Sequence, residues 1–424
     1  MSSVADSASR PTDTARAAGA GERWLDDWLT AHREDLIAWR RHIHRNPELS
    51  RQEFGTTAFV AEKLRAAGLD PQLLPAGTGL YCDIGPADAD GKRMGLRADL
   101  DALPMNEESG LDFASTVPGV AHTCGHDVHT AVVLGAGLAL AAAPRLETGV
   151  RLIFQPAEEV MPGGALDVIA AGVLSGVSRI FALHCDPHLQ VGTVGVKAGP
   201  ITSAADIIDV HLSGPGGHTS RPQLTTDLVG ALGRLITDVP ALLARRVDPR
   251  SRTVMVWGSV EAGRAANAIP KRGTARGTVR TGEYDTWAEI EPIMRELVHA
   301  AVAPTGVQVR IDYHRGMPPV DNEEYSATML RRAAGVLGPD AAVDTLQSSG
   351  GEDFAWYLEK VPGAMGRLGV WPGSGPVCDI HQPDFYADER ALEYGVRLLV
   401  HLAAPPLRSP NLADPRNPAP PRER

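Results

Sequence analysis

Short apolar strands alternate with helices along the first half of this chain, and this alternation is the feature that most restricts its fold. Predicted strands at residues 94–99, 150–155 and 179–184 are separated by predicted helices at 128–143 and 164–174. Such alternation is typical of a largely parallel sheet covered by helices on both faces. We therefore expect an α/β fold that binds its ligand beyond the carboxyl ends of the strands.

The pattern of elements changes between residues 201 and 315. The predicted order there is β-α-β-β-α-β, the ferredoxin-like split unit, which can fold on its own. These elements are expected at residues 207–212, 227–243, 253–260, 274–280, 287–303 and 307–314. The α/β pattern then resumes. The sequence thus predicts a catalytic domain made of residues 22–200 and 316–404, with a lid domain inserted at 201–315.

Composition narrows the class of protein. A chain of 424 residues favours two domains, and its net charge of −11 argues against binding to nucleic acid or to an anionic membrane surface. Four scattered cysteines are too few for a disulfide scaffold, so we expect a cytoplasmic protein. Residues 1–21 lack the apolar segment of a secretory signal, and residues 405–424 are rich in proline. We expect both ends to be disordered.

Side chains able to bind a metal follow several of the predicted strands. They are Asp99 and Asp101 after the first strand, Glu158 and Glu159 after the second, His184 at the end of the third, Cys124 and His126 before a helix, and His381 near the end of the chain. Parallel strands deliver such residues to one edge of a sheet. Chance explains one such coincidence but explains four poorly.

The residue types suit a transition metal, because thiolate and imidazole favour zinc while carboxylates also admit manganese. Gly125 lets the backbone turn so that Cys124 and His126 can face one ion. Taken singly, each residue has a plainer interpretation. Cys-Gly-His is more often structural, His184 fits a core histidine, and His381 fits a loop histidine.

The pair Glu158-Glu159 suggests a mechanism. Adjacent residues of an extended chain point in opposite directions, so one carboxylate can bind metal while the other faces water as a general base. The plainer alternative is two solvated surface acids.

The predicted lid contains three further candidates. A Gly/Pro-rich turn holds His218 outward, either as an incidental turn residue or as a catalytic donor brought in by domain closure. Asn267 and Arg280 could hold a substrate carboxylate, although Arg280 also fits a surface strand.

Several motifs occur together in the order of a known family. They are RHIHRNPELS at 41–50, LRADLDALP at 96–104, HTCGHDVH at 122–129, FQPAEE at 154–159, GH at 217–218 and GEDF at 351–354. From about residue 26 to 402 the chain resembles the aminoacylase/carboxypeptidase G metallopeptidases. It is most similar to the subgroup of hippurate hydrolases and indole-acetyl-amino-acid hydrolases.

The resemblance implies a zinc-exopeptidase-like catalytic domain with an inserted lid that mediates a homodimer. It makes Glu158 the general base and assigns five metal ligands: Cys124, His126, Glu159, His184 and His381. Five ligands exceed the needs of one tetrahedral ion, so we expect two divalent ions, zinc or manganese, with cobalt or nickel as further candidates.

The resemblance assigns supporting roles to the remaining candidates. Asp99 stands where dinuclear relatives elsewhere in the family carry a histidine ligand, so Asp99 and Asp101 are expected behind the ligands. His218 matches a lid histidine that reaches the active site across the dimer in relatives. Asn267 and Arg280 match substrate-binding positions of the lid.

The expected reaction is metal-dependent hydrolysis of the amide bond of N-acyl amino acids, with a small-molecule substrate as the only non-protein partner. Three alternatives stay open. A dipeptidase or carboxypeptidase would need an acidic partner for a free α-amino group, and the sequence does not identify one. A non-catalytic binding protein would not need to keep Glu158. A structural zinc protein would more often use a closed, Cys-rich site.

Overall fold

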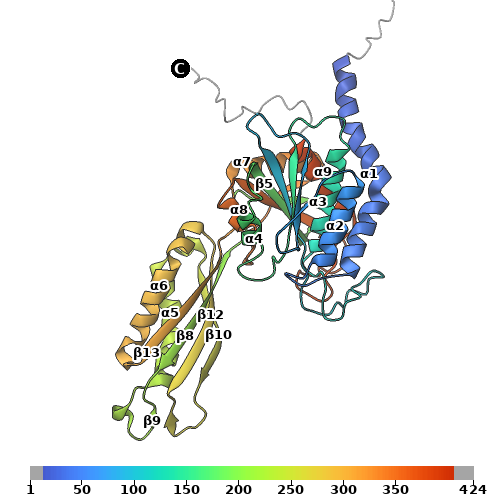
Figure 1. The fold of residues 1–424 in the computed structure, drawn as a ribbon. Coiled ribbons are helices and arrows are strands. Elements are labelled where there is room, and N and C mark those ends of the chain that lie inside the picture. The colour runs from blue at the N-terminus through green and yellow to red at the C-terminus, as the bar shows by residue number, and fades with distance from the viewer. Residues whose placement is uncertain (1–12, 405–424) are drawn as a thin grey trace, which may run out of the picture.

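The computed structural model describes residues 13–404 of the chain. It has two parts: a large α/β unit and an elongated unit that projects from it (Figure 1). In this range no helix combines the length and the apolar character needed to cross a membrane.

The large unit is built on an eight-stranded sheet in the order β1-β2-β4-β3-β5-β16-β6-β15. Its strands are β1 (Gln72–Leu73), β2 (Leu80–Ile84), β3 (Arg93–Asp99), β4 (Val150–Gln155), β5 (Val177–Gln190), β6 (Val194–Val196), β15 (Ala342–Asp344) and β16 (Gly363–Trp371). The central strands β4, β3, β5 and β16 are parallel. The expected α/β fold with a largely parallel sheet is therefore confirmed.

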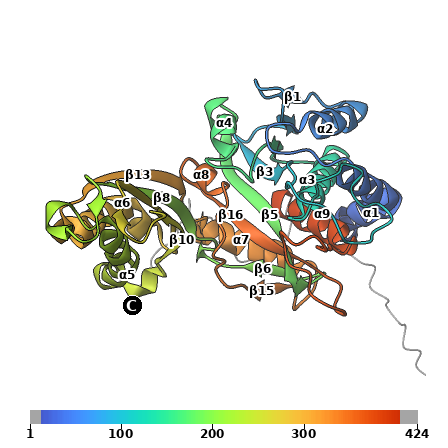
Figure 2. The same cartoon turned by 90° about the horizontal axis from the view of Figure 1, so that it is seen from below.

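Helices cover both faces of this sheet (Figure 2). One face packs against α1 (Asp13–Arg45), α2 (Phe54–Ala66), α3 (His126–Ala141), α7 (Glu324–Gly335) and α9 (Arg390–Ala403). The other face packs against α4 (Ala165–Ala170) and α8 (Ala355–Leu358). Leu152 belongs to the first core and Ile153 to the second, because successive side chains of a strand point to opposite faces.

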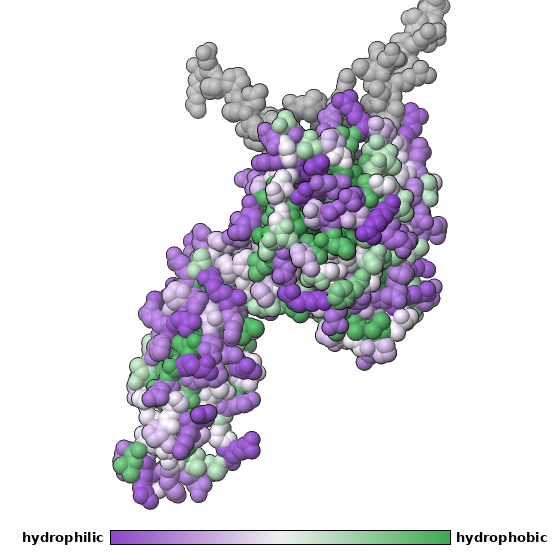
Figure 3. Space-filling view, viewed as in Figure 1, coloured by the Kyte–Doolittle hydropathy of each residue, from purple (hydrophilic) through white to green (hydrophobic). Residues whose placement is uncertain are grey.

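The projecting unit has an antiparallel sheet in the order β10-β12-β8-β13. Its strands are β8 (Ala204–Ser213), β10 (Val254–Ala262), β12 (Arg272–Thr281) and β13 (Gln308–Met317). Helices α5 (Leu228–Arg246) and α6 (Tyr284–Val302) pack on one face and leave the other face open. We call this unit the small domain. Its surface is largely hydrophilic in the view of Figure 3, with apolar groups in small patches.

Two-stranded ladders and single turns complete the fold. They are β9 (Gly217–His218) with β11 (Ala268–Ile269), β7 (Gly199–Pro200) with β14 (Asp321–Asn322), and the 3-10 turns Pro222–Leu224, Pro249–Ser251 and Ala303–Thr305. The β7–β14 ladder brings the two chain crossings between the large unit and the small domain side by side.

Several predicted boundaries were wrong. Helix α1 begins at Asp13, so residues 13–21 are helical rather than disordered, and their sequence is rich in alanine, the best helix former. Residues 1–12 and 405–424 lie outside the described residues. Helix α3 begins at His126, two residues earlier than predicted, and α4 is shorter than predicted. Strand β5 runs on to Gln190, beyond the predicted end at residue 184.

Candidate active site

Five side chains with metal-binding atoms meet at the carboxyl edge of the central sheet. Cys124 precedes α3, His126 opens it, Glu159 follows β4, His184 lies in β5 and His381 lies in the loop after β16. Cys124 Sγ lies 3.5 Å from His184 Nε2, and His381 Nε2 lies 3.3 Å from Glu159 Oε1. His126 Nε2 lies 3.7 Å from the same Glu159 oxygen. The structure thus brings together all five ligands that the resemblance implied, and we call them the ligand cluster.

Gly125 makes the turn between Cys124 and His126. Its φ of +92° lies in the left-handed region, which side chains other than glycine rarely adopt. A Cβ atom at this position would lie 2.7 Å from Cys185 Sγ. Both observations explain why this turn requires glycine, as the sequence suggested.

Backbone carbonyls orient two of the histidines. His126 Nδ1 lies 2.8 Å from the Asp101 carbonyl oxygen, and His184 Nδ1 lies 2.8 Å from the Cys185 carbonyl oxygen. Because a carbonyl only accepts, each Nδ1 carries a proton, so Nε2 is the ring atom that a metal can bind in place of a proton.

Two atoms of the ligand cluster are buried without any hydrogen-bond partner in the described part of the chain. They are His126 Nε2 and Glu159 Oε1. Buried polar atoms are rarely left unsatisfied, so these two point to a group that binds between them.

Asp101 holds the segment that carries both glutamates. Its Oδ1 accepts the backbone N–H of Glu158 at 3.0 Å, and its Oδ2 accepts the backbone N–H of Glu159 at 2.9 Å. The Ser50 hydroxyl donates to Oδ2 at 2.6 Å. Asp101 therefore positions the glutamates, and its oxygens are already occupied.

Asp99 contacts His129, and its Oδ2 also lies 3.8 Å from His126 Nε2, in a further group of possible ligand atoms with both histidines. Its Oδ1 lies 2.7 Å from His129 Nδ1, and its Oδ2 accepts from Arg97 Nη1 at 2.7 Å. His129 Nε2 in turn accepts the backbone N–H of Cys185 at 2.8 Å. The geometry of Asp99 suits a residue that supports the ligands from behind.

The cluster carries an excess of negative charge. Burial raises the pKa of Glu158 well above its usual range, and the nearby carboxylates of Glu352 and Glu159 raise it further. Burial likewise raises the pKa of the Cys124 thiol, with Glu159 and Glu158 adding to the effect. Burial alone would lower the pKa of His126, but neighbouring carboxylates, Asp99 first, outweigh it and raise the value to about 10. A divalent cation would neutralise this charge.

The donor set fits divalent metal ions. Cys124 belongs to two groups whose ligand atoms all lie within 4.8 Å of one another, one with His126 and His184 and one with Glu159 and His381. A thiolate shared between two groups suits two ions better than one.

A cleft of about 800 Å³ opens beside the ligand cluster. The large unit contributes Glu158, His184 and the loop at residues 346–351, and the small domain contributes Ala205 and Arg280. Arg280 Nη1 donates to the Ser349 carbonyl at 2.6 Å. The structure therefore places Arg280 at the cleft, as a substrate-binding residue requires.

His218 and Asn267 lie elsewhere. They sit together at the far tip of the small domain, where β9 pairs with β11 (Figure 1). Strand β8 starts at the cleft and runs ten residues toward this tip, roughly 30 Å at about 3.3 Å per residue. Rotation of the small domain about its connections at the cleft keeps the tip at that distance. His218 therefore lies away from the cleft of its own chain, and its catalytic role stays a prediction.

Sequence reasoning gave no role to several buried charged residues near the cleft. Arg97 donates to Gln155 at 2.9 Å and to Asp353 at 2.8 Å, and Glu352 lies 3.1 Å from its guanidinium. Arg367 lines the cleft from β16. In the sequence, each of these arginines stands inside an otherwise apolar strand segment. This position indicates that the arginine is buried, but it does not identify the side chain that pairs with it.

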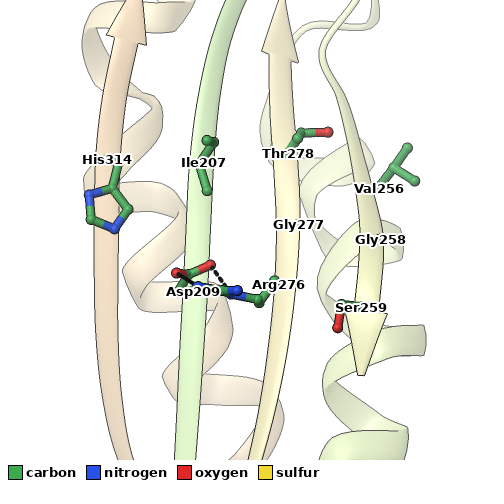
Figure 4. A pocket seen from close by; sticks show the side chains of 9 residues that line it. All are labelled: Ile207, Asp209, Val256, Gly258, Ser259, Arg276, Gly277, Thr278 and His314. Carbon is green, nitrogen blue, oxygen red and sulfur yellow. Dashed lines mark hydrogen bonds and ion pairs between the residues drawn. The ribbon is translucent and has the colours of Figure 1, made fainter. Parts of the chain in front are cut away.

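A second hollow, of about 520 Å³, lies on the open face of the small-domain sheet (Figure 4). Asp209 and Arg276 pair across it at 3.2 Å, beside Ile207 and Val256. Among the described residues, none of the groups that could hold a metal ion lies there. The possible metal ligands of the described residues therefore lie at the first cleft and not at this hollow.

Comparison with known proteins shows the family of this chain. Residues 95–404 match the model of peptidase family M20/M25/M40. The chain belongs to this family. The N-acetylcysteine deacetylase of Bacillus subtilis is 38% identical over 87% of this chain and 96% of its own length. A solved dinuclear metal-binding M20 peptidase of Bacillus subtilis is 35% identical, with a TM-score of 0.77 over 88% of this chain and 98% of that one.

A putative glutamate–cysteine ligase of Rhodococcus jostii is 52% identical over 87% of this chain, but the chain spans only 46% of that protein. The resemblance drawn from the sequence motifs is confirmed. This M20 chain is an amidohydrolase, and its ligand cluster fits divalent metal ions.

Proposed function

We propose that the chain hydrolyses the amide bond of N-acyl amino acids, with Glu158 as the general base. The observation that carries this proposal is the position of Glu158. Its Oε2 lies 4.0 Å from His126 Nε2, it lines the cleft, and Asp101 holds its backbone. The deacetylase activity named for the Bacillus subtilis relative supports the same reaction class.

Divalent ions in the ligand cluster, zinc or manganese with cobalt or nickel as further candidates, would supply a Lewis acid that makes water nucleophilic near neutral pH. Glu158 accepts the proton of the attacking water at a carboxylate oxygen and then returns it to the leaving amine. Arg280 binds the α-carboxylate of the substrate and orients the amide in the cleft.

The first experiment compares the release of free amino acid from N-acetyl, N-benzoyl and long-chain acyl amino acids, with each metal added and with a chelator as control. Glu158→Gln keeps the size of the side chain but removes its basicity. We expect turnover to fall by about 10²–10⁴-fold while metal content is retained. Substantial turnover by this variant would remove Glu158 from the role of base. Release from dipeptides in preference to acyl amino acids would favour the peptidase alternative.

His218 enters the proposal through a second copy of the chain. The backbone N–H of Ser220 donates to His218 Nδ1 at 3.1 Å, so the proton of the neutral ring is on Nε2. This exposed N–H can stabilise the developing oxyanion in the cleft of another subunit, beside Asn267. The unpaired edge strand β10, with Val254 and Val256 more than half exposed, is the proposed dimer contact.

Mixing two inactive variants tests this arrangement. His218→Ala subunits keep Glu158, and Glu158→Gln subunits keep His218. If His218 acts on the partner subunit, the mixture recovers activity after the subunits exchange, because one site of each mixed dimer is complete. A mixture as inactive as its components would place His218 outside the reaction.

We also propose a cytoplasmic location. The support is that all four cysteines are free thiols in the structure.

A further inference from the structure

Arg367 is a buried cation in the middle of the central sheet. It lies on β16, paired in register with His184 of β5, and is only 8% exposed. Its guanidinium nevertheless reaches the cleft. Nη2 donates to the Ser348 hydroxyl at 2.9 Å.

Arg367 differs from the other buried arginines in its lack of an acidic partner. Three arginines of the described residues are buried: Arg40, Arg97 and Arg367. Arg40 pairs with Asp127 at 2.6 Å, and Arg97 pairs with Asp99 and Asp353 at 2.7 and 2.8 Å. No carboxylate within the described range lies within 4.0 Å of Arg367. A buried charge is costly unless it is paired, so this position calls for an anion.

Three acids of the cleft have contacts with groups other than Arg367. Glu352 Oε1 accepts the backbone N–H of Phe354 at 2.9 Å and lies 3.1 Å from Arg97. Glu159 faces His381, and Asp186 accepts the backbone N–H of His188 at 2.9 Å. Asp186 and Glu352 act on Arg367 from a distance, but none of these three acids forms an ion pair with it in the structure, so its guanidinium can bind a further anion.

A second arginine faces the same cleft from the other domain. Arg280 donates to the carbonyl of Ser349, the residue next to the Arg367 partner Ser348. Two guanidinium groups from different domains thus approach adjacent residues of one cleft loop. Guanidinium binds carboxylates in a bidentate fashion, which gives both affinity and orientation.

We propose that the preferred substrates of this cleft carry two carboxylates, one bound by Arg280 and the other by Arg367. The proposal rests on the amidohydrolase function proposed above and names its substrate class. The first carboxylate is the α-carboxylate of the amino acid. The second is on the amino-acid side chain, as in N-acyl aspartate or glutamate, or on the acyl arm, as in an N-succinyl amino acid.

Matched substrate pairs test the proposal on the metal-loaded protein. N-acetyl-glutamate is compared with its neutral isostere N-acetyl-glutamine, and N-succinyl-alanine with N-butyryl-alanine, so the two pairs distinguish the two sources of the carboxylate. We expect kcat/KM to favour the charged member of one pair by about 10–100-fold, the range of a charged hydrogen bond. Arg367→Met should abolish this preference, so that the ratio of kcat/KM between the charged and the neutral member falls to about one.

Two further variants separate binding from structural support. Ser348→Ala removes the loop contact of Arg367 but keeps its charge, and should keep the preference. Arg276→Met, on the same strand as Arg280 but exposed and paired with Asp209, should leave both pairs unchanged. Arg367→Lys keeps the charge without the bidentate geometry and should retain part of the preference; it also serves if the methionine variant fails to fold.

Three outcomes would overturn the proposal. The first is that kcat/KM shows no preference for the charged substrate in either pair. The others are that Arg367→Met lowers kcat/KM equally for both members of a pair, or that Ser348→Ala abolishes the preference as Arg367→Met does. If no acyl amino acid is hydrolysed, the proposed function fails, and calorimetric titration with glutarate and N-acetyl-glutamate still decides the role of Arg367. Weaker binding by Arg367→Met than by wild type supports it, and equal binding or no binding by both overturns it.

Discussion

Replacing Asp101 by asparagine tests how the site is positioned. The change keeps the size of the side chain and leaves the backbone carbonyl that orients His126 in place. It replaces one carboxylate oxygen by an NH₂ group, which cannot accept. Whichever way the amide turns, the backbone N–H of Glu158 or Glu159 loses its acceptor.

The size of the effect follows from that single loss. An unsatisfied buried donor costs about 1–3 kcal/mol, and about 2 kcal/mol corresponds to roughly a 30-fold change in an equilibrium or rate. Because the affected segment carries a proposed ligand and the proposed base, the loss should appear in metal affinity, in kcat, or in both. Replacement of residues that support metal ligands typically costs about 10–100-fold.

Two measurements check the prediction: competition for metal against a chelating dye, and kcat at saturating metal. Ser50→Ala is the matched control, since it removes one hydrogen bond to Asp101 without freeing a backbone donor of the glutamates. We expect less than about a threefold change in that control. If Asp101→Asn stays within threefold of wild type in both assays, Asp101 does not position this segment.

Two further predictions concern stability. Gly125→Ala should lower the free energy of unfolding of the metal-free protein by about 1–3 kcal/mol, because of the positive φ and the clash with Cys185. Gly233→Ala, on open helix surface, is the control and should be neutral or slightly stabilising; equal effects in urea titrations would contradict this account. Glu107→Gln tests a buried pair. Burial raises the pKa of Glu107, but hydrogen bonds from His44 and others lower it to about 2. The pKa of His44 is raised, because carboxylates, Asp127 first, outweigh burial. The Glu107 contribution is lost as pH falls below about 4.3, and the His44 contribution is lost as pH rises above its raised pKa. The destabilisation by Glu107→Gln should therefore be largest near pH 6 and smaller at pH 3 and pH 9. Equal destabilisation at all three would refute the pairing.

The parallel core of the fold was predictable because local patterns encode it. The apolar runs of β3, β4 and β5 are buried on both faces, and the residues after them fall at one edge of the sheet. Strand β2 was missed: it is short, and its antiparallel pairing with β4 is not encoded locally. The start of α3 was misjudged because its first two residues, His126 and Asp127, are polar yet completely buried.

Some residues of the candidate site could likewise be predicted from local sequence patterns, and others could not. Residue type and position at strand ends were enough to group Cys124, His126 and Glu159. The position of His218 depends on the length and direction of an entire strand, which no motif records. Arg367 is a lone charge in an apolar strand, and only the structure shows which acids lie beyond its reach.

The β7–β14 ladder has a consequence for how the chain folds. Strand β16 must pair with β5, although most of the intervening chain belongs to the small domain. Once that domain has folded, the ladder holds its two ends together, and more than half of the intervening chain no longer counts as a flexible loop. Each halving of a loop lowers the entropic cost of closing it by about 0.6 kcal/mol. If the small domain folds first, it would thus lower the entropic cost of pairing β16 with β5.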